Sequence, residues 1–142
     1  MSIHIPLPLQ IGMQETFAKI ITEGEAALFA GLVGDNNPRV HSEAEVNSIN
    51  SDRVSVQPEY LVGIIGGLLN SHLPGEGSQC VTMQYEFLAP VCCGERIEAV
   101  IELTHLDVVK HLATFRTDCY NQDRKQVITG KAVMFVPERI LP

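Results

Sequence analysis

The chain has 142 residues, of which 45% are hydrophobic and 19% are charged, and its formal net charge is −7. This length and composition are typical of a single globular domain, residues 1–142, with its own hydrophobic core, and they exclude a disordered chain. The acidic balance argues against nucleic acid as a main partner, because a phosphate backbone calls for a surplus of Lys and Arg.

The first third of the sequence predicts a strand followed by a capped helix. Residues 14–21, QETFAKII, are expected to form the opening strand. Thr22 and Glu25 make a capping-box pattern, which marks the start of a helix. Apolar residues then recur at helical spacing and predict a buried face, namely Ala26, Phe29, Ala30 and Val33. Ser42 with Glu45 repeats the capping-box pattern and predicts a short second helix.

Residues 58–72, PEYLVGIIGGLLNSH, predict a central helix. Pro58 suits the first helical position, and Glu59 suits the positive end of the helix dipole. The segment is apolar nearly all round, which is typical of a helix enclosed by other structure. Each glycine in it would weaken an exposed helix by ~1 kcal/mol. We therefore expect a tightly wrapped sheet to approach the backbone closely at the three glycines, Gly63, Gly66 and Gly67.

From residue 79 onward the pattern is that of β-strands. Apolar residues alternate with polar ones over residues 81–87, a period of two. Residues 96–105 are expected to form another strand, and residues 110–120 and 126–136 flank the polar turn NQDRK as an antiparallel hairpin. This order of elements predicts an α+β fold, with one curved antiparallel sheet wrapped around a central helix.

Cysteine usage and hydropathy indicate a cytoplasmic protein. The four cysteines lack metal-ligand spacing, so we expect reduced thiols at Cys80, Cys92, Cys93 and Cys119. The first ten residues, MSIHIPLPLQ, have no basic start and no uninterrupted apolar stretch, so no signal peptide is expected. The most apolar segment, residues 60–69, is too short to span a bilayer.

Three motifs stand in order along the chain: GDNNPRVH at residues 34–41, LPGEGS at 73–78 and YEFLAPVCCGERI at 85–97. Together they resemble the MaoC-like (R)-specific enoyl-CoA hydratases, which have the hot-dog fold. The similarity runs from about residue 10 to residue 137. The resemblance implies hydration of a trans-2-enoyl-CoA to the (R)-3-hydroxyacyl-CoA, without a metal or redox cofactor. It also implies a homodimer, with the active site at the interface between two sheets joined edge to edge. No membrane partner is expected, because the most apolar segment is too short to span a bilayer.

The resemblance implies that the family's acid and imidazole carry over to Asp35 and His41. In the family this pair holds a water between its two side chains at the end of an acyl tunnel. Such a pair can take one proton from water and deliver another to the α-carbon. The negative charge that builds on the thioester oxygen needs a preorganised donor, usually a backbone N–H at a helix N-terminus. Asn37 and Pro38 are expected to keep the loop rigid, and Asn37 is also a candidate for substrate contact. The sequence leaves open which of the pair is the base.

Two positions depart from the family pattern. The imidazole lies six residues beyond Asp35, where the family has five. The family's His-Gly pair falls on Gln57 and Pro58, and proline has no backbone N–H. The oxyanion donor must then be the N–H of Glu59 or Tyr60, or the side-chain amide of Gln57. The sequence therefore predicts that these three residues contact the substrate.

Gly77 and Ser78 are further candidates for substrate contact, with a simple turn as the alternative. Three functions remain open at this point. The first is hydration of an acyl thioester of coenzyme A or of a carrier protein. The second is a hot-dog thioesterase that directs water at the thioester carbonyl. The third is a non-catalytic subunit that binds acyl thioesters.

Overall fold

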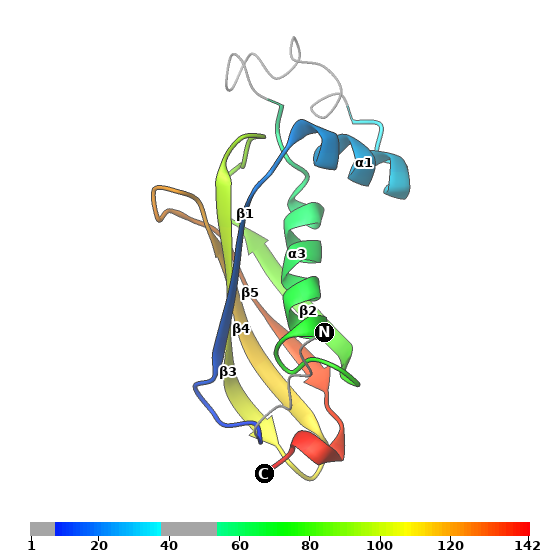
Figure 1. The fold of residues 1–142 in the computed structure, drawn as a ribbon, viewed down its shortest axis with the longest axis vertical. Coiled ribbons are helices and arrows are strands. Elements are labelled where there is room, and N and C mark those ends of the chain that lie inside the picture. The colour runs from blue at the N-terminus through cyan, green and yellow to red at the C-terminus, as the bar shows by residue number, and fades with distance from the viewer. Residues whose placement is uncertain (1–7, 38–53) are drawn as a thin grey trace, which may run out of the picture.

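The computed structural model describes residues 8–37 and 54–142, and it contains a five-stranded antiparallel sheet with a long helix against one face (Figure 1). The strands lie in the order β1-β3-β4-β5-β2. Their bounds are Gln14–Ile20 for β1, Gln79–Phe87 for β2, Arg96–Asp107 for β3, Leu112–Tyr120 for β4 and Gln126–Phe135 for β5. The helices are α1, Glu23–Val33, and α3, Pro58–Ser71, followed near the C-terminus by the short 3-10 helix η2, Glu138–Ile140. The predicted α+β layout is confirmed, while the predicted helix at residues 42–45 lies outside the described residues.

The core lies between α3 and the facing side of the sheet. Every second residue of β3 from Ile97 to Leu103 is buried there, as period-two patterning predicts. From α3, one stripe of side chains packs against these positions, consisting of Leu61, Ile65, Leu68 and Leu69. Full burial of such a side chain contributes roughly 1.5–3 kcal/mol. This packing fixes α3 along the sheet, with its N-terminal end at the level where β2 ends (Figure 1).

The expectation that other structure encloses α3 on all sides is wrong for the described chain. Gly63 and Gly67 are exposed, and a Cβ placed on Gly63, Gly66 or Gly67 would meet no atom within 4 Å. The physical reason is that the single sheet covers one face of the helix and leaves the opposite face open.

The prediction for α1 needs a smaller correction. Thr22 accepts a hydrogen bond from the Glu25 N–H at 3.1 Å, which confirms the predicted cap. Ala26 and Ala30 are buried as predicted, but Val33 is 58% exposed. The helix crosses over the N-terminal end of α3 with its first half, so its last turn extends beyond the core (Figure 1).

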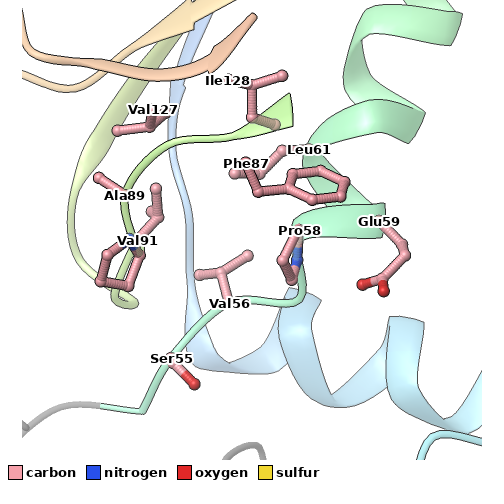
Figure 2. Close-up of a pocket in the computed structure, with 11 residues that line it drawn as sticks. Ser55, Val56, Pro58, Glu59, Leu61, Phe87, Ala89, Val91, Val127 and Ile128 are labelled. Atoms are coloured by element: carbon pink, nitrogen blue, oxygen red, sulfur yellow. The ribbon is translucent and has the colours of Figure 1, made fainter. Parts of the chain in front are cut away.

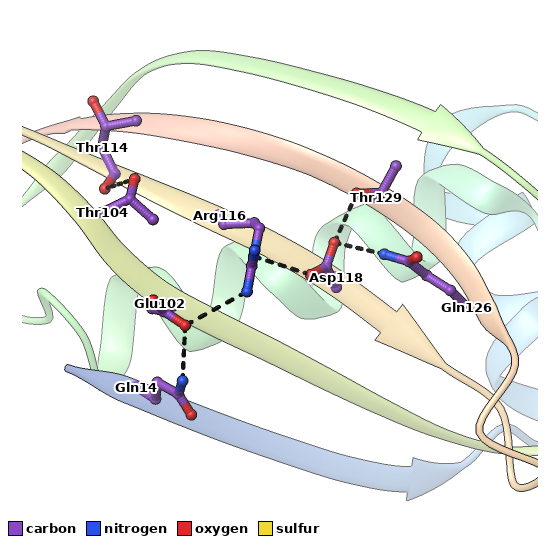
Figure 3. A network of polar contacts seen from close by, with 8 residues as sticks. All are labelled: Gln14, Glu102, Thr104, Thr114, Arg116, Asp118, Gln126 and Thr129. Carbon is purple, nitrogen blue, oxygen red and sulfur yellow. Dashed lines mark hydrogen bonds and ion pairs between the residues drawn. The ribbon is translucent and has the colours of Figure 1, made fainter. Parts of the chain in front are cut away.

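The outer face of the sheet carries a network of polar contacts that joins four strands (Figure 3). Arg116 pairs with Glu102 at 3.6 Å and with Asp118 at 3.5 Å. Asp118 also accepts hydrogen bonds from Gln126 and Thr129, both at 2.8 Å. These contacts satisfy a carboxylate that is only 6% exposed. Across residues 8–37 and 54–142, no helix is long and apolar enough to cross a membrane.

Candidate active site

The start of α3 is held against the connection between β2 and β3. The Val56 N–H donates to the Val91 carbonyl at 2.7 Å, and the Cys93 N–H donates to the Val54 carbonyl at 2.8 Å. This short antiparallel pairing brings the residues before α3 alongside the turn that follows Phe87. Gln57 then forms the N-cap, and Pro58 begins the helix as predicted.

A largely apolar hollow of about 350 Å³ lies at this end of α3. Its walls come from Pro58 and Leu61 of α3, Phe87 at the end of β2, and Ile128 of β5 (Figure 2). Glu59 also lines it, and Figure 2 shows its carboxylate directed away from Phe87. We call this cavity the Phe87 hollow. Its volume and mainly apolar lining suit an acyl chain.

The first turn of α3 offers one backbone donor at the edge of this hollow. Pro58 has no N–H, and the Tyr60 N–H donates to the Gln57 carbonyl at 3.0 Å. The Glu59 N–H has no protein acceptor within the described part of the chain. The Glu59 N–H is therefore available to a ligand, and it lies at the positive end of the dipole of α3.

Gln57 lies under α1 and is not part of the lining of the Phe87 hollow. Its side chain is 0% exposed, and its Nε2 donates to the Ala26 carbonyl of α1 at 3.2 Å. Its Oε1 is buried without a hydrogen-bond partner among the described residues. The side-chain amide thus ties α1 to α3 and is already engaged, so among the three predicted donors the Glu59 N–H is the one without a protein acceptor in the described residues.

Tyr60 faces the opposite side of α3, toward β1. Its hydroxyl donates to Glu25 Oε2 at 2.6 Å, and Glu25 also pairs with Lys19. Burial, and then the neighbouring Glu25 carboxylate, raise the pKa of Tyr60. Burial works to raise the pKa of Glu25, but the hydrogen bonds from Lys19 and Tyr60 outweigh it, so that pKa is lowered. Tyr60 lines a second hollow of about 220 Å³, so the structure does not bring it together with Glu59.

Asp35 lies just beyond the C-terminal end of α1. Gly34 ends the helix in the left-handed conformation, with φ of 74°, and the Asp35 N–H donates to the Ala30 carbonyl at 2.9 Å. Asp35 Oδ1 accepts from the Asn37 N–H at 2.9 Å, which closes an Asx turn. Asn37 itself is exposed. His41 and Pro38 lie outside the described residues, so the convergence of the acid and the imidazole stays a prediction.

Gly77 and Ser78 lie in the turn after α3. Ser78 Oγ donates to the Gly75 carbonyl, and Gly77 has φ of +88°, close to Pro137 and Arg139. α3 has 14 residues and is therefore roughly 21 Å long. Within one chain these two residues are thus at the far end of the helix from the Phe87 hollow.

The apolar lining of the hollow was not recognised from the sequence. Phe87, Ile128 and Val91 have the pattern of core residues, and nothing in their spacing distinguishes a cavity wall from a packed core. The cysteines are free, and burial raises the pKa of Cys93 to about 11, so this thiol stays protonated and is a poor nucleophile. In the described ranges no group of three or more His, Cys, Asp or Glu is placed to hold a metal ion.

Comparison with known proteins gives similar sequences over nearly the whole chain. An (R)-specific enoyl-CoA hydratase of Rhodospirillum rubrum is 33% identical over 138 residues, which cover 96% of this chain and 94% of that protein. A 3-hydroxybutyryl-CoA dehydratase of Methylorubrum extorquens is 28% identical, over 92% of this chain and 83% of that protein. No family model matches the sequence.

Among solved structures, the (R)-hydratase from Aeromonas caviae involved in PHA biosynthesis superposes with a TM-score of 0.86. The two sequences are 32% identical, and the match covers 91% of this chain and 98% of that one. The arrangement of one sheet around a long helix is therefore the hot-dog fold of that enzyme.

Proposed function

Because this chain belongs to the (R)-specific enoyl-CoA hydratase family, we propose that it adds water across the double bond of trans-2-enoyl thioesters. The product is the (R)-3-hydroxyacyl thioester, and the same site catalyses the reverse dehydration. The single observation that carries this proposal is the identity of 33% over 94% of the R. rubrum hydratase. The Phe87 hollow, beside the free donor of a helix N-terminus, supports it independently.

In the proposed mechanism the thioester carbonyl oxygen accepts a hydrogen bond from the Glu59 N–H. Asp35 and His41 hold one water, whose oxygen bonds to C3 while a proton passes to the pair. The electrons of the double bond move toward the thioester oxygen, where the Glu59 N–H and the helix dipole stabilise the charge. A proton from the pair then reaches C2, so the atoms of one water are added overall. The acyl chain occupies the Phe87 hollow.

We further propose a homodimer formed through strand β2. β2 is an edge of the sheet, and the side chains of Val81 and Phe87 on it are 54% and 50% exposed. An exposed apolar edge strand favours pairing with another strand. A second sheet joined at this edge would also place structure near the open face of α3, where Gly63 and Gly67 permit a close approach.

The acyl carrier is proposed to be coenzyme A, as the names of the relatives indicate, with a carrier protein as the alternative. A cytoplasmic location is proposed as well. Its support is that all four cysteines are free thiols, which persist in reducing compartments.

One observation favours a second candidate, a subunit that binds acyl thioesters without catalysis. Pro58 removes a backbone donor from the first turn of α3, and loss of one oxyanion donor typically costs roughly 3–4 kcal/mol of barrier.

A single assay separates the candidates. The protein is incubated with a short trans-2-enoyl-CoA and, separately, with the saturated acyl-CoA, while the conjugated double bond and free thiol are followed.

Loss of the double bond without thiol release is the result expected for a hydratase. Thiol release from both substrates would instead identify a thioesterase. Binding of either thioester without any reaction would identify the non-catalytic subunit and refute the proposed activity.

A further inference from the structure

The side of the sheet that faces α3 contains two buried hydroxyl groups that the proposed mechanism does not use. Thr117 is 0% exposed, and its Oγ1 has no hydrogen-bond partner in residues 8–37 and 54–142. The same is true of the buried Tyr85 hydroxyl. A buried hydroxyl without a partner costs roughly 1–3 kcal/mol, so most folded proteins avoid it. Two of them in one place call for an explanation.

The strand register brings these two hydroxyls together. Gly130 of β5 pairs with Tyr85 on one side and with Thr117 on the other, so the three residues form one row across the sheet. Partners in neighbouring strands direct their side chains to the same face. Burial raises the pKa of Tyr85, and the Thr117 hydroxyl in the same row lowers it. They form a pair, which we call the hydroxyl pair.

Gly130 is what allows this arrangement. A Cβ on Gly130 would lie 2.5 Å from Cδ1 of Tyr85 and 2.2 Å from the Gln84 carbonyl oxygen. The tyrosine ring therefore lies across the glycine and reaches toward Thr117, and no other residue at position 130 leaves room for it.

The hydroxyl pair lies one row further in than the Phe87 hollow. Phe87 and Ile128 line that hollow. Ile128 pairs with Phe87 on one side and with Cys119 on the other, so these three residues form the row next to the hydroxyl pair. Two residues along a strand correspond to about 7 Å. β2 begins near the C-terminal end of α3 and ends at Phe87, beside the hollow. The row of Tyr85 comes before that of Phe87 on this strand, and it therefore lies deeper beneath the helix. On α3, Leu61 faces the hollow, and the buried Ile65 lies one helical turn further along the same side of the helix.

We propose that Tyr85 and Thr117 determine specificity by binding an oxygen atom on the acyl chain, so that the preferred substrate is an enoyl thioester with a hydroxyl group on its chain. This inference rests on the proposed function, because it places the acyl chain in the Phe87 hollow. A hydroxyl is both donor and acceptor, and so it satisfies two hydroxyls at once. An unsubstituted chain long enough to reach this row leaves both of them unpaired. Sites that lose such a hydrogen bond discriminate strongly against the analogue that lacks it.

The test compares pairs of trans-2-enoyl-CoA substrates with five to nine acyl carbons, one member of each pair carrying a terminal hydroxyl. The ratio of kcat/KM for the hydroxylated member to that for the plain member is measured for each length. We expect a ratio of at least about tenfold at one length, and a fall of about tenfold or more in that ratio in the double variant Tyr85→Phe, Thr117→Val. The matched controls, Tyr120→Phe and Thr114→Val, remove the same groups elsewhere on β4 and should leave the ratio unchanged.

A ratio near one at every length would overturn the inference, and so would a preference that the double variant retains. In the latter case the hydroxyl pair is satisfied by a buried water or by its own rearrangement. The single variants repeat the measurement if the double variant does not fold.

If the wild-type protein hydrates none of these substrates, the proposed function fails separately. The inference is then decided by calorimetric binding of the saturated acyl-CoA pairs. A hydroxyl preference in affinity that is lost in the double variant would support it, and equal affinities would refute it.

Discussion

Replacing Asp35 with Asn separates the charge of this residue from its structural role. The carboxylate accepts a hydrogen bond from the Asn37 N–H at 2.9 Å, and the Oδ1 of an asparagine can accept the same bond. The Asx turn should therefore survive, and the free energy of unfolding should change by no more than about 0.5 kcal/mol. Asp35→Ala removes the acceptor as well and should cost a further ~0.5–1.5 kcal/mol.

The effect on catalysis should be much larger than the effect on folding. A positioned acid or base typically contributes about 10²–10⁴-fold, so kcat should fall by that factor in Asp35→Asn. At 1.36 kcal/mol for each tenfold, this is roughly 3–5 kcal/mol of barrier. The assay follows loss of the conjugated double bond of a trans-2-enoyl-CoA, with urea unfolding of each variant measured in parallel.

Asp107 offers a matched control for this experiment. Its Oδ1 accepts from the Lys110 N–H at 2.9 Å, so a carboxylate also closes the connection between β3 and β4, over a span one residue longer than at Asp35. Asp107→Asn should leave both kcat and stability nearly unchanged. Wild-type turnover in Asp35→Asn would remove Asp35 from the mechanism, and a large loss of stability would show that the turn depends on the charge.

Three further changes test the packing and the electrostatics described above. Gly130→Ala should destabilise the fold by about 1–3 kcal/mol or more in urea unfolding, because its Cβ would overlap the Tyr85 ring, and unchanged stability would contradict this close approach. Gln57→Ala should lower the free energy of unfolding by about 1–3 kcal/mol, since it removes a buried hydrogen bond to α1; a neutral effect would mean that the tie between the helices does not contribute. The pKa of Glu25 is lowered in the folded protein from its ordinary value of 4.5, so its ionised carboxylate stabilises the fold above pH 4.5. This stabilisation is lost as the pH falls through the lowered pKa of the folded state. Lys19→Met should therefore lower the free energy of unfolding at pH 7 by ~0.2–1 kcal/mol. It should also make the difference between the free energies of unfolding at pH 7 and pH 3 smaller, as measured by urea midpoints across that range.

Local patterns in the sequence predicted most of the elements. The cap at Thr22, the start of α3 at Pro58, and the hairpin around residues 121–125 follow from side-chain chemistry that acts within a few residues. Period-two alternation marked the strands for the same reason, because it reflects which face of a strand each side chain takes. The order of the three motifs along the chain indicates the family by itself.

Tertiary structure alone decided which residues lie opposite one another across the sheet. The sequence identified Gln57 and Tyr60 as substrate contacts, but the fold buries Gln57 under α1 and turns Tyr60 toward Glu25, which leaves the Glu59 N–H at the Phe87 hollow. Likewise, the glycines of α3 indicated a close approach that a single sheet does not supply.

The row that joins Tyr85 to Thr117 depends on the register of three strands that are far apart in the sequence. Register is set by the packing of one whole face of the sheet against α3, and a shift by one residue would turn every side chain to the other face. Sequence periodicity shows that a strand has two faces. Only the folded chain shows which residues of different strands meet on one of these faces, and so that the Phe87 hollow and the hydroxyl pair lie at successive rows of the sheet.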